Sequence, residues 1–143
     1  MKYDNCIKME FLSRSCNEGF SRTAVAALAA QLDPTLEQLN EIKTAVSEAV
    51  TNSIVHGYKD KLGIIYITAK IRGTKLTVTV RDKGCGISDI EKARQPLFTT
   101  GNESERSGMG FTIMESFMDR VSVRSTVGGG TKVTLEKTLE IRR

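Results

Sequence analysis

Four short patterns whose residue types can bind and activate a nucleotide occur in one order along the chain. They are E-A-V-T-N at 48–52, D-K-G-C-G at 82–86, S-G-M-G at 107–110 and G-G-G-T at 128–131. Each pattern alone is a weak signal. Together they describe a site in which a carboxylate and an amide share one helix, while glycine turns approach a base and a phosphate chain. A protein kinase or an ATPase is therefore the leading interpretation.

The first pattern places a carboxylate and an amide one helical turn apart. Glu48, Asn52 and His56 recur at i, i+4 and i+8, so they share one stripe of a helix. Asparagine is unfavourable inside a helix, which makes its place here informative. An amide oxygen suits Mg²⁺, and a neighbouring carboxylate can accept a proton from an attacking hydroxyl. A solvated helix face, on which Glu37 and Glu41 also lie, is the ordinary alternative.

The second pattern predicts contacts with a purine base. Asp82 ends a predicted strand, and Gly84 and Gly86 follow it. Glycines let the backbone approach a flat ligand, because they carry no Cβ. A buried carboxylate accepts a hydrogen bond from the exocyclic amine of adenine, where guanine has a carbonyl, so the pattern favours ATP over GTP. An ordinary D-x-G turn between a strand and a loop is the alternative.

Two glycine-rich turns complete the set. Gly108 and Gly110 open a predicted helix, and unpaired N–H groups at a helix N-terminus attract phosphate. Arg106 lies next to this turn and can pair with phosphate or remain exposed. The run 128–130 reads as a hairpin tip, and Thr131 adds a hydroxyl that can support the predicted base contact. A flexible hinge and a plain hairpin are the alternatives.

The elements expected to position these residues follow the order β-α-α-β-β-lid-α-β-β. Strands are predicted over 7–13, 64–71, 75–81, 121–126 and 131–139, and helices over 18–32, from 33–34 to Gly57, and over 111–119. Gly73-Thr74 is a two-residue hairpin turn. Hairpin-linked strands with grouped helices predict an α+β two-layer sandwich, with helices on one face of a mixed, mostly antiparallel sheet.

The second helix and the lid carry most of the predicted chemistry. Asp33 is the expected N-cap, with Pro34 in the first turn. The apolar stripe of this helix runs through Leu36, Leu39, Ile42, Val46, Ala49 and Ser53. Residues 87–107 form a long polar segment with little periodicity, which predicts a functional lid.

Composition limits the possible classes of protein. The 143 residues predict one domain, 1–143, with 39% hydrophobic and 27% charged residues, as in ordinary globular proteins. The net charge of +4 comes from 21 basic and 17 acidic residues, which are spread along the chain with no run of five or more. Binding of nucleic acid is therefore possible but not indicated, and clustering of the basic residues on the surface would be its test. Three cysteines without metal-ligand spacing, no signal-peptide pattern and no apolar run of about 20 residues predict reduced thiols and a cytoplasmic protein.

Other catalytic and nucleotide motifs are absent from the sequence. There is no G-x-x-x-x-G-K-[ST], which excludes a P-loop. The glycines at 84 and 86 have no third partner at 89 and do not open a helix, so they fit no Rossmann motif. His56 is the only histidine and no G-x-S-x-G occurs, which disfavours a serine hydrolase.

With all four patterns in order, the chain resembles the GHKL superfamily of ATPases and kinases. The segment E-x-x-x-N-x-x-x-H-G at 48–57 is similar to its N-box, and 82–86, 107–111 and 129–131 are similar to its three glycine boxes. Within the superfamily the chain most resembles the anti-sigma-factor serine kinases, and among them the sporulation anti-sigma F factors. Its size, its short lid and the segments E-A-V-T-N-S-I-V-H-G-Y and R-Q-P-L-F-T-T carry this resemblance over nearly all 143 residues.

The resemblance implies a Bergerat-type ATP-binding fold and a role for each matching residue. Glu48 would be the general base, Asn52 the Mg²⁺ ligand and Asp82 the contact to the adenine amine of ATP or ADP. The remaining nucleotide contacts would be Gly84, Gly86 and Thr131 at the base, and Thr99, Thr100, Arg106, Gly108 and Gly110 at the phosphates.

The resemblance also implies protein partners. A homodimer would sequester an RNA polymerase sigma factor, sigma F in the sporulation relatives, and would phosphorylate an anti-anti-sigma factor on serine. Glu18 and Arg22, on the early helix outside every box, are the candidate partner contacts. No direct nucleic-acid or membrane partner is expected. A nucleotide-gated binding module with little or no phosphotransfer is the alternative function, and an interaction domain without nucleotide is the third.

Overall fold

The protein, seen in a computed structural model, is described over residues 3–90, 94 and 109–139. The elements are β1 (Asn5–Leu12), α1 (Cys16–Ala29), the 3-10 helix η1 (Ala30–Leu32), α2 (Leu36–Asn52), the π-helix η2 (Ser53–Gly57), β2 (Ile64–Arg72), β3 (Lys75–Asp82), α4 (Gly110–Phe117), β4 (Arg120–Thr126) and β5 (Gly130–Thr138). Apart from small shifts at their ends, these are the elements and the order that the sequence predicts.

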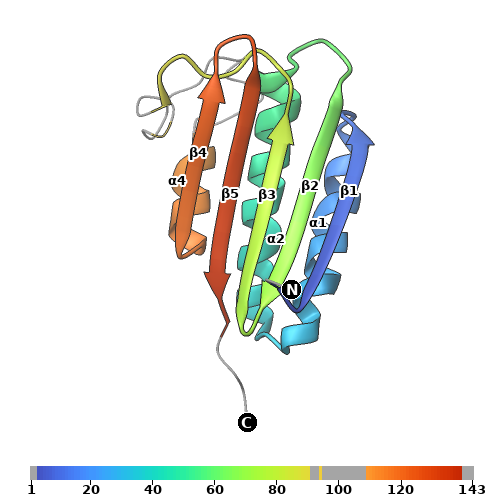
Figure 1. The fold of residues 1–143 in the computed structure, drawn as a ribbon, viewed down its shortest axis with the longest axis vertical. Coiled ribbons are helices and arrows are strands. Elements are labelled where there is room, and N and C mark those ends of the chain that lie inside the picture. The colour runs from blue at the N-terminus through green and yellow to red at the C-terminus, as the bar shows by residue number, and fades with distance from the viewer. Residues whose placement is uncertain (1–2, 91–93, 95–108, 140–143) are drawn as a thin grey trace.

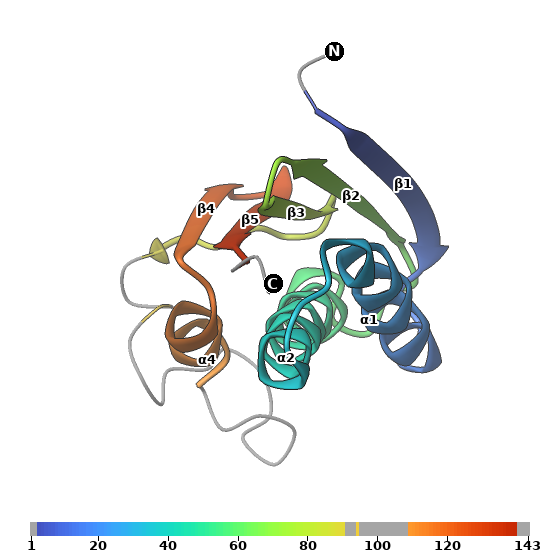
Figure 2. The same ribbon diagram turned by 90° about the horizontal axis from the view of Figure 1, so that it is seen from below.

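The five strands form one sheet, and the helices cover one of its faces (Figures 1 and 2). The strand order is β1-β2-β3-β5-β4, so β3 is central. All strand pairs in the described residues are antiparallel, so the sheet there contains no parallel pair, although a mixed sheet is expected from the sequence. The predicted α+β two-layer sandwich is confirmed.

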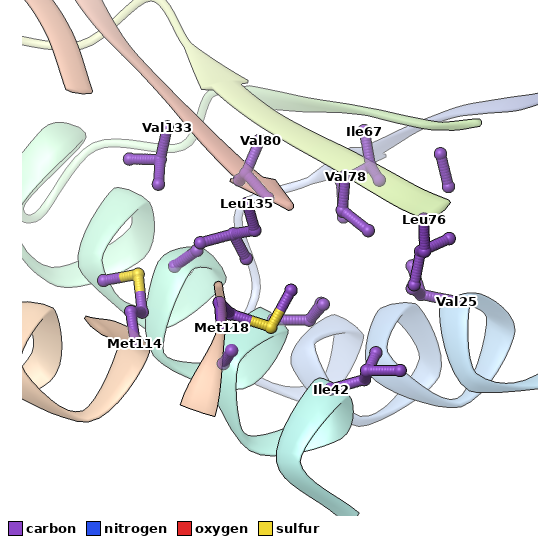
Figure 3. Close-up of a cluster of buried hydrophobic side chains, with 14 of the residues drawn as sticks. Val25, Ile42, Ile67, Leu76, Val78, Val80, Met114, Met118, Val133 and Leu135 are labelled. Atoms are coloured by element: carbon purple, nitrogen blue, oxygen red, sulfur yellow. The ribbon is translucent and has the colours of Figure 1, made fainter. Parts of the chain in front are cut away.

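The core lies between the sheet and the helices. Inward-facing residues of β2, β3 and β5 alternate with outward polar ones, as in a sheet with one solvated face. Figure 3 shows Val78, Val80 and Leu135 pointing from the sheet toward the helices. Ile42 and Met114 meet them from α2 and α4, and each is fully buried. Burial of a large apolar side chain contributes about 1.5–3 kcal/mol, so this core holds the sheet and the helical layer together.

The start of α2 differs from the expected one. Asp33 adopts the left-handed conformation after η1, and Pro34 precedes the helix. The N-cap is Thr35, whose hydroxyl accepts a hydrogen bond from the Gln38 backbone at 3.0 Å, while the Gln38 side chain accepts one from the Thr35 backbone at 2.9 Å. This capping box satisfies two backbone donors at once, which explains why it displaces the predicted cap.

The predicted stripe of α2 is exposed at its first member, partly buried at Leu39 and buried from Ile42 onward. Leu36 is 79% exposed, because it lies in the first turn beyond the edge of the core, whereas Ile42, Val46 and Ala49 are fully buried. The helical segment ends at Gly57 as expected, but its last turn is π-helical: the Tyr58 N–H donates to the carbonyl of Ser53 at 2.9 Å. Most of the predicted lid, 87–107, lies outside the described residues.

The capping box gives a stability prediction. Thr35→Ala should lower the free energy of unfolding by about 1 kcal/mol, because the Gln38 N–H at the start of α2 loses its acceptor. Urea unfolding followed by circular dichroism measures the change.

Ser15→Ala is the matched control, since the Ser15 side chain makes no capping bond at the start of α1. Equal losses in the two variants would show that the box does not stabilise α2.

Candidate functional site

Three of the four sequence patterns meet at one end of the sheet, at the top of Figure 1. The Cys85 N–H donates to the carbonyl of Gly57 at 2.9 Å, and the Gly128 N–H donates to the carbonyl of Cys85 at 2.7 Å. The end of the N-box, the first glycine box and the third glycine box are thereby joined through one residue. The order of the strands brings them together, because β3 ends here and β5 begins here.

Asp82 lies at the centre of this junction. It is the last residue of β3 and is 2% exposed. Its Oδ2 accepts a hydrogen bond from Ser53 Oγ at 2.7 Å, and its Oδ1 accepts one from the Gly84 N–H at 2.9 Å. Each oxygen keeps further acceptor capacity, because an ionised carboxylate offers about four lone-pair positions. The carboxylate is therefore held in a fixed orientation and can still accept a hydrogen bond from a ligand amine.

The glycines beside Asp82 make room for the chain itself. A Cβ on Gly84 would lie 2.2 Å from the carbonyl oxygen of Gly57, and a Cβ on Gly86 would lie 2.2 Å from that of Thr126. Gly86 also has φ +77, which disfavours other residues. The sequence predicts that these glycines make room for a ligand. The structure shows that neighbouring backbone fills the space in which their Cβ atoms would lie.

Thr131 is brought to Asp82 by the register of the sheet. The two residues are directly opposite on β5 and β3. The Thr131 hydroxyl lies 2.9 Å from Ser125 Oγ, which also accepts from the Ile87 N–H at 2.7 Å. No hydrogen bond between Thr131 and Asp82 occurs among the described residues, so the predicted support of the carboxylate comes from Ser53 instead.

Glu48 and Asn52 lie one turn apart near the end of α2, on the helix that the sequence predicts for them. Glu48 is half-buried, and Asn52 is 9% exposed. In the described part of the chain, the Asn52 carboxamide makes no hydrogen bond, yet no side-chain nitrogen or oxygen there is both sealed from solvent and unpartnered. Its amide atoms thus open toward solvent from a largely buried residue. His56 lies in η2, half-buried.

The candidate partner residues lie at the same end of the molecule. Arg22 Nη1 contacts both carboxylate oxygens of Glu18 at 2.9 Å and Ser47 Oγ at 3.3 Å. The Arg22 side chain remains 41% exposed. Because Ser47 directly precedes Glu48 in α2, the pair on α1 is placed beside the turn that carries the predicted base.

The phosphate side of the site is only partly described. Thr99, Thr100, Arg106 and Gly108 lie outside the described residues. Gly110 begins α4 and is buried. Since α4 ends just before β4 begins, and β4 runs toward the junction, the N-terminus of α4 lies at the same end of the sheet as Asp82 (Figure 1).

Three residues that sequence reasoning missed hold the junction together. The Ser53 hydroxyl donates a hydrogen bond to Asp82. Ser125 contacts both the Ile87 N–H and the Thr131 hydroxyl, so it joins the chain after the first glycine box to the β4–β5 hairpin. The Tyr58 hydroxyl accepts from the Lys83 N–H at 2.8 Å and donates to the carbonyl of Ile64. The position of Ser53 directly after Asn52 was the only sequence signal among them, because each of the three residues makes a contact more than 20 residues away in the chain.

Comparison with known proteins decides the family. The chain matches the family described as Histidine kinase-like ATPase domain over residues 19–137. The anti-sigma F factor of Thermoanaerobacter sp. (strain X514) is 61% identical over 137 residues, which cover 96% of each chain. Those of Clostridium beijerinckii and Anoxybacillus flavithermus are 52% and 57% identical, over 96% and 94% of this chain and 97% and 93% of the relatives. The chain belongs to the anti-sigma F factor family.

A solved structure supports the fold of this family member. The RsbU and RsbW domains of a Mycobacterium tuberculosis protein superpose with a TM-score of 0.68 at 19% identity, over 94% of this chain and 32% of that one. The shared fold is the GHKL-type α+β sandwich, and the ATPase family implies nucleotide binding. In the described ranges, no helix has the length and apolarity to cross a membrane.

The contact between Ser53 and Asp82 gives the second prediction. Ser53→Ala should lower the free energy of unfolding by about 1.5–3 kcal/mol, because a buried carboxylate loses a hydrogen-bond donor. Urea unfolding of the apo protein measures this change. Ser122→Ala, on the outward side of β4, is the control and should change stability by no more than about 0.5 kcal/mol.

A loss in Ser53→Ala no larger than that of Ser122→Ala would mean that solvent replaces the serine hydroxyl without cost. The carboxylate would then not depend on Ser53 for its orientation.

Proposed function

We propose that the protein is an ATP-dependent protein serine kinase that also sequesters an RNA polymerase sigma factor, sigma F in sporulation. Its substrate is an anti-anti-sigma factor, phosphorylated on a serine, and its working form is a cytoplasmic homodimer. Family membership supports the anti-sigma role, since the relatives are anti-sigma F factors. The histidine kinase-like ATPase domain supports the use of ATP.

One observation carries the kinase proposal. Asn52 is largely buried in the last turn of α2, and no group in the described residues uses its carboxamide. Its amide atoms open toward solvent and are engaged by no described group, so they remain available to a ligand that enters from that side. Ser53, the next residue, contacts Asp82. The Asn52 amide and the Asp82 carboxylate, which is proposed to bind adenine, are therefore linked through two adjacent residues, Asn52 and Ser53.

The residues fit a magnesium nucleotide. An amide oxygen is a hard ligand, and Mg²⁺ commonly takes one or two protein ligands together with phosphate oxygens and water. Asn52 would hold the ion through its side-chain oxygen. When bound, Mg²⁺ would offset negative charge on the phosphate oxygens of ATP. Asp82 would accept a hydrogen bond from the adenine amine, with Gly84, Gly86 and Thr131 around the base.

Glu48 would act as the general base one turn before Asn52. As the substrate serine oxygen bonds to the γ-phosphorus, the bond from that phosphorus to the β–γ bridging oxygen breaks and ADP leaves. The serine hydroxyl proton passes to the Glu48 carboxylate and then to solvent. Thr99, Thr100, Arg106, Gly108 and Gly110 are the proposed phosphate contacts. Glu18 and Arg22 are the proposed contacts with the sigma factor, beside the same turn of α2.

Replacement of Glu48, the proposed general base, tests the mechanism of phosphate transfer. Glu48→Gln should lower the rate of serine phosphorylation by at least about 100-fold, because the amide cannot accept the hydroxyl proton. ATP affinity should stay near that of the unaltered protein. Labelling of a cognate antagonist with radioactive ATP measures transfer, and calorimetry measures binding.

Unchanged transfer in Glu48→Gln would exclude Glu48 as the base. If the unaltered protein yields neither ADP nor phosphoserine on long incubation while it still binds ATP and the sigma factor, it is a nucleotide-gated binding module.

Replacement of Asp82, the proposed contact to adenine, tests nucleotide binding. Asp82→Asn should weaken ATP binding by about 10–100-fold, since the hydrogen bond from adenine to a charged acceptor is lost. Asp60→Asn, on an exposed loop, is the control. Equal affinities of Asp82→Asn and the unaltered protein, with the fold verified by circular dichroism, would reject the adenine contact.

A further inference from the structure

Three polar residues stand side by side on the inner face of the sheet, at the end where the candidate nucleotide site lies. Asp82 of β3 is directly opposite Thr131 of β5, and Thr131 is directly opposite Ser125 of β4. We call these three residues the polar row. The next two rows across the same strands are wholly apolar, namely Val80, Val133 and Val123, then Val78, Leu135 and Val121. The polar row therefore marks the place where the core ends and contacts of another kind begin.

Ser125, at one end of the polar row, has three hydrogen-bonding neighbours. Its Oγ accepts a hydrogen bond from the Ile87 N–H at 2.7 Å and donates one to the carbonyl of Gly130 at 3.0 Å. The Thr131 hydroxyl lies 2.9 Å from the same oxygen. A serine hydroxyl has one hydrogen and two lone pairs, so it can serve all three neighbours at once.

The number of hydrogens fixes the direction of the contact between Ser125 and Thr131. The Ile87 N–H can only donate, and the Gly130 carbonyl can only accept. Because Ser125 uses its single hydrogen for Gly130, the contact with Thr131 is a hydrogen bond only if Thr131 donates. The Thr131 oxygen then has lone pairs, but no hydrogen, for any further partner. In the part of the chain that the structure describes, no other group uses these lone pairs.

Asp82, beside Thr131 in the polar row, is also an acceptor. Its two oxygens accept hydrogen bonds from Ser53 Oγ and the Gly84 N–H, and an ionised carboxylate has no hydrogen to give. Directly opposite residues on an antiparallel pair point to the same side, with Cβ atoms about 4.5–5.5 Å apart. Asp82 and Thr131 therefore present two acceptors next to each other. The hydroxyl hydrogens of Ser53, Thr131 and Ser125 are all used within the protein.

We propose that Ser125 is a positioning residue that sets nucleotide specificity through Thr131. By accepting the Thr131 hydrogen, Ser125 turns that hydroxyl into a second acceptor beside Asp82. The amino group of adenine has two hydrogens, so it donates one to Asp82 and one to Thr131, directly or through one bound water. A base with a carbonyl oxygen at that position, such as guanine or hypoxanthine, meets two acceptors and no donor. This inference rests on the proposed binding of ATP with its adenine at Asp82.

Comparison of ATP with inosine triphosphate (ITP), which has a carbonyl oxygen in place of the amine, tests the role of Ser125. Calorimetry on the whole protein measures both dissociation constants. The unaltered protein should bind ATP at least about tenfold more tightly than ITP, because the hydrogen bond from the amine to a charged acceptor is lost. In Ser125→Ala the freed Thr131 hydroxyl can donate to the ITP carbonyl, so the preference for ATP should fall about 3–10-fold.

Three further variants separate this role from a purely structural one, which would weaken ATP and ITP equally. Ser125→Thr keeps a hydroxyl and should keep the preference for ATP. Ser116→Ala, which removes an exposed hydroxyl on α4, is the matched control and should also keep it. Thr131→Val should weaken ATP binding about 3–10-fold, and Ser125→Ala added to it should not change the preference further. An unchanged preference in Ser125→Ala, or a further fall in the double variant, would overturn the proposal.

Urea unfolding without nucleotide checks the hydrogen bond itself. Ser125→Ala and Thr131→Val each remove the same bond, so the double variant should lose less free energy of unfolding than the sum of the single losses. Additive losses would show that Thr131 does not donate to Ser125, and would overturn the proposal. If the unaltered protein binds neither ATP nor ITP, the proposed function fails and this inference fails with it. Tight ATP binding whose preference over ITP does not depend on Ser125 overturns this inference alone.

Discussion

The buried carboxylate of Asp82 is the constraint on which the site depends. A carboxylate that is 2% exposed must be hydrogen-bonded, because an unpaired buried charge is very costly. Ser53 and the Gly84 N–H meet that requirement, and in doing so they fix the π-helical end of α2 against the end of β3. The turn after β3 and the last turn of the N-box are therefore placed by one side chain.

The glycine boxes also serve the packing of the chain. Gly57, Gly84 and Gly86 lie where a Cβ would collide with a carboxylate or with backbone. Close approach at these points lets Cys85 hydrogen-bond to both Gly57 and Gly128. A glycine motif read as a ligand cradle is thus also the means by which three distant segments reach one another. The rigid junction that results is what a preorganised nucleotide site requires.

The two faces of the sheet divide the remaining tasks. The inner face packs on α1, α2 and α4 and supplies the core (Figures 2 and 3). The outer face carries polar and charged side chains, among them Arg81, Lys132 and Arg124, which lie directly opposite one another on β3, β5 and β4. The candidate nucleotide site lies at the end of the sheet, where β3 ends and β5 begins.

The sequence by itself determined the element order, the two-layer class and the helix that carries Glu48 and Asn52, because strand alternation, helix propensity and glycine turns act locally. It misplaced the cap of α2, since Thr35 and Asp33 are both good caps and only the chain path selects one. Only the tertiary structure decided that Ser53 and Ser125 hold the junction, that Gly84 packs on Gly57, and that Arg81, Lys132 and Arg124 form one row. These contacts join residues far apart in the chain, and strand register, which no local pattern encodes, sets which of them meet.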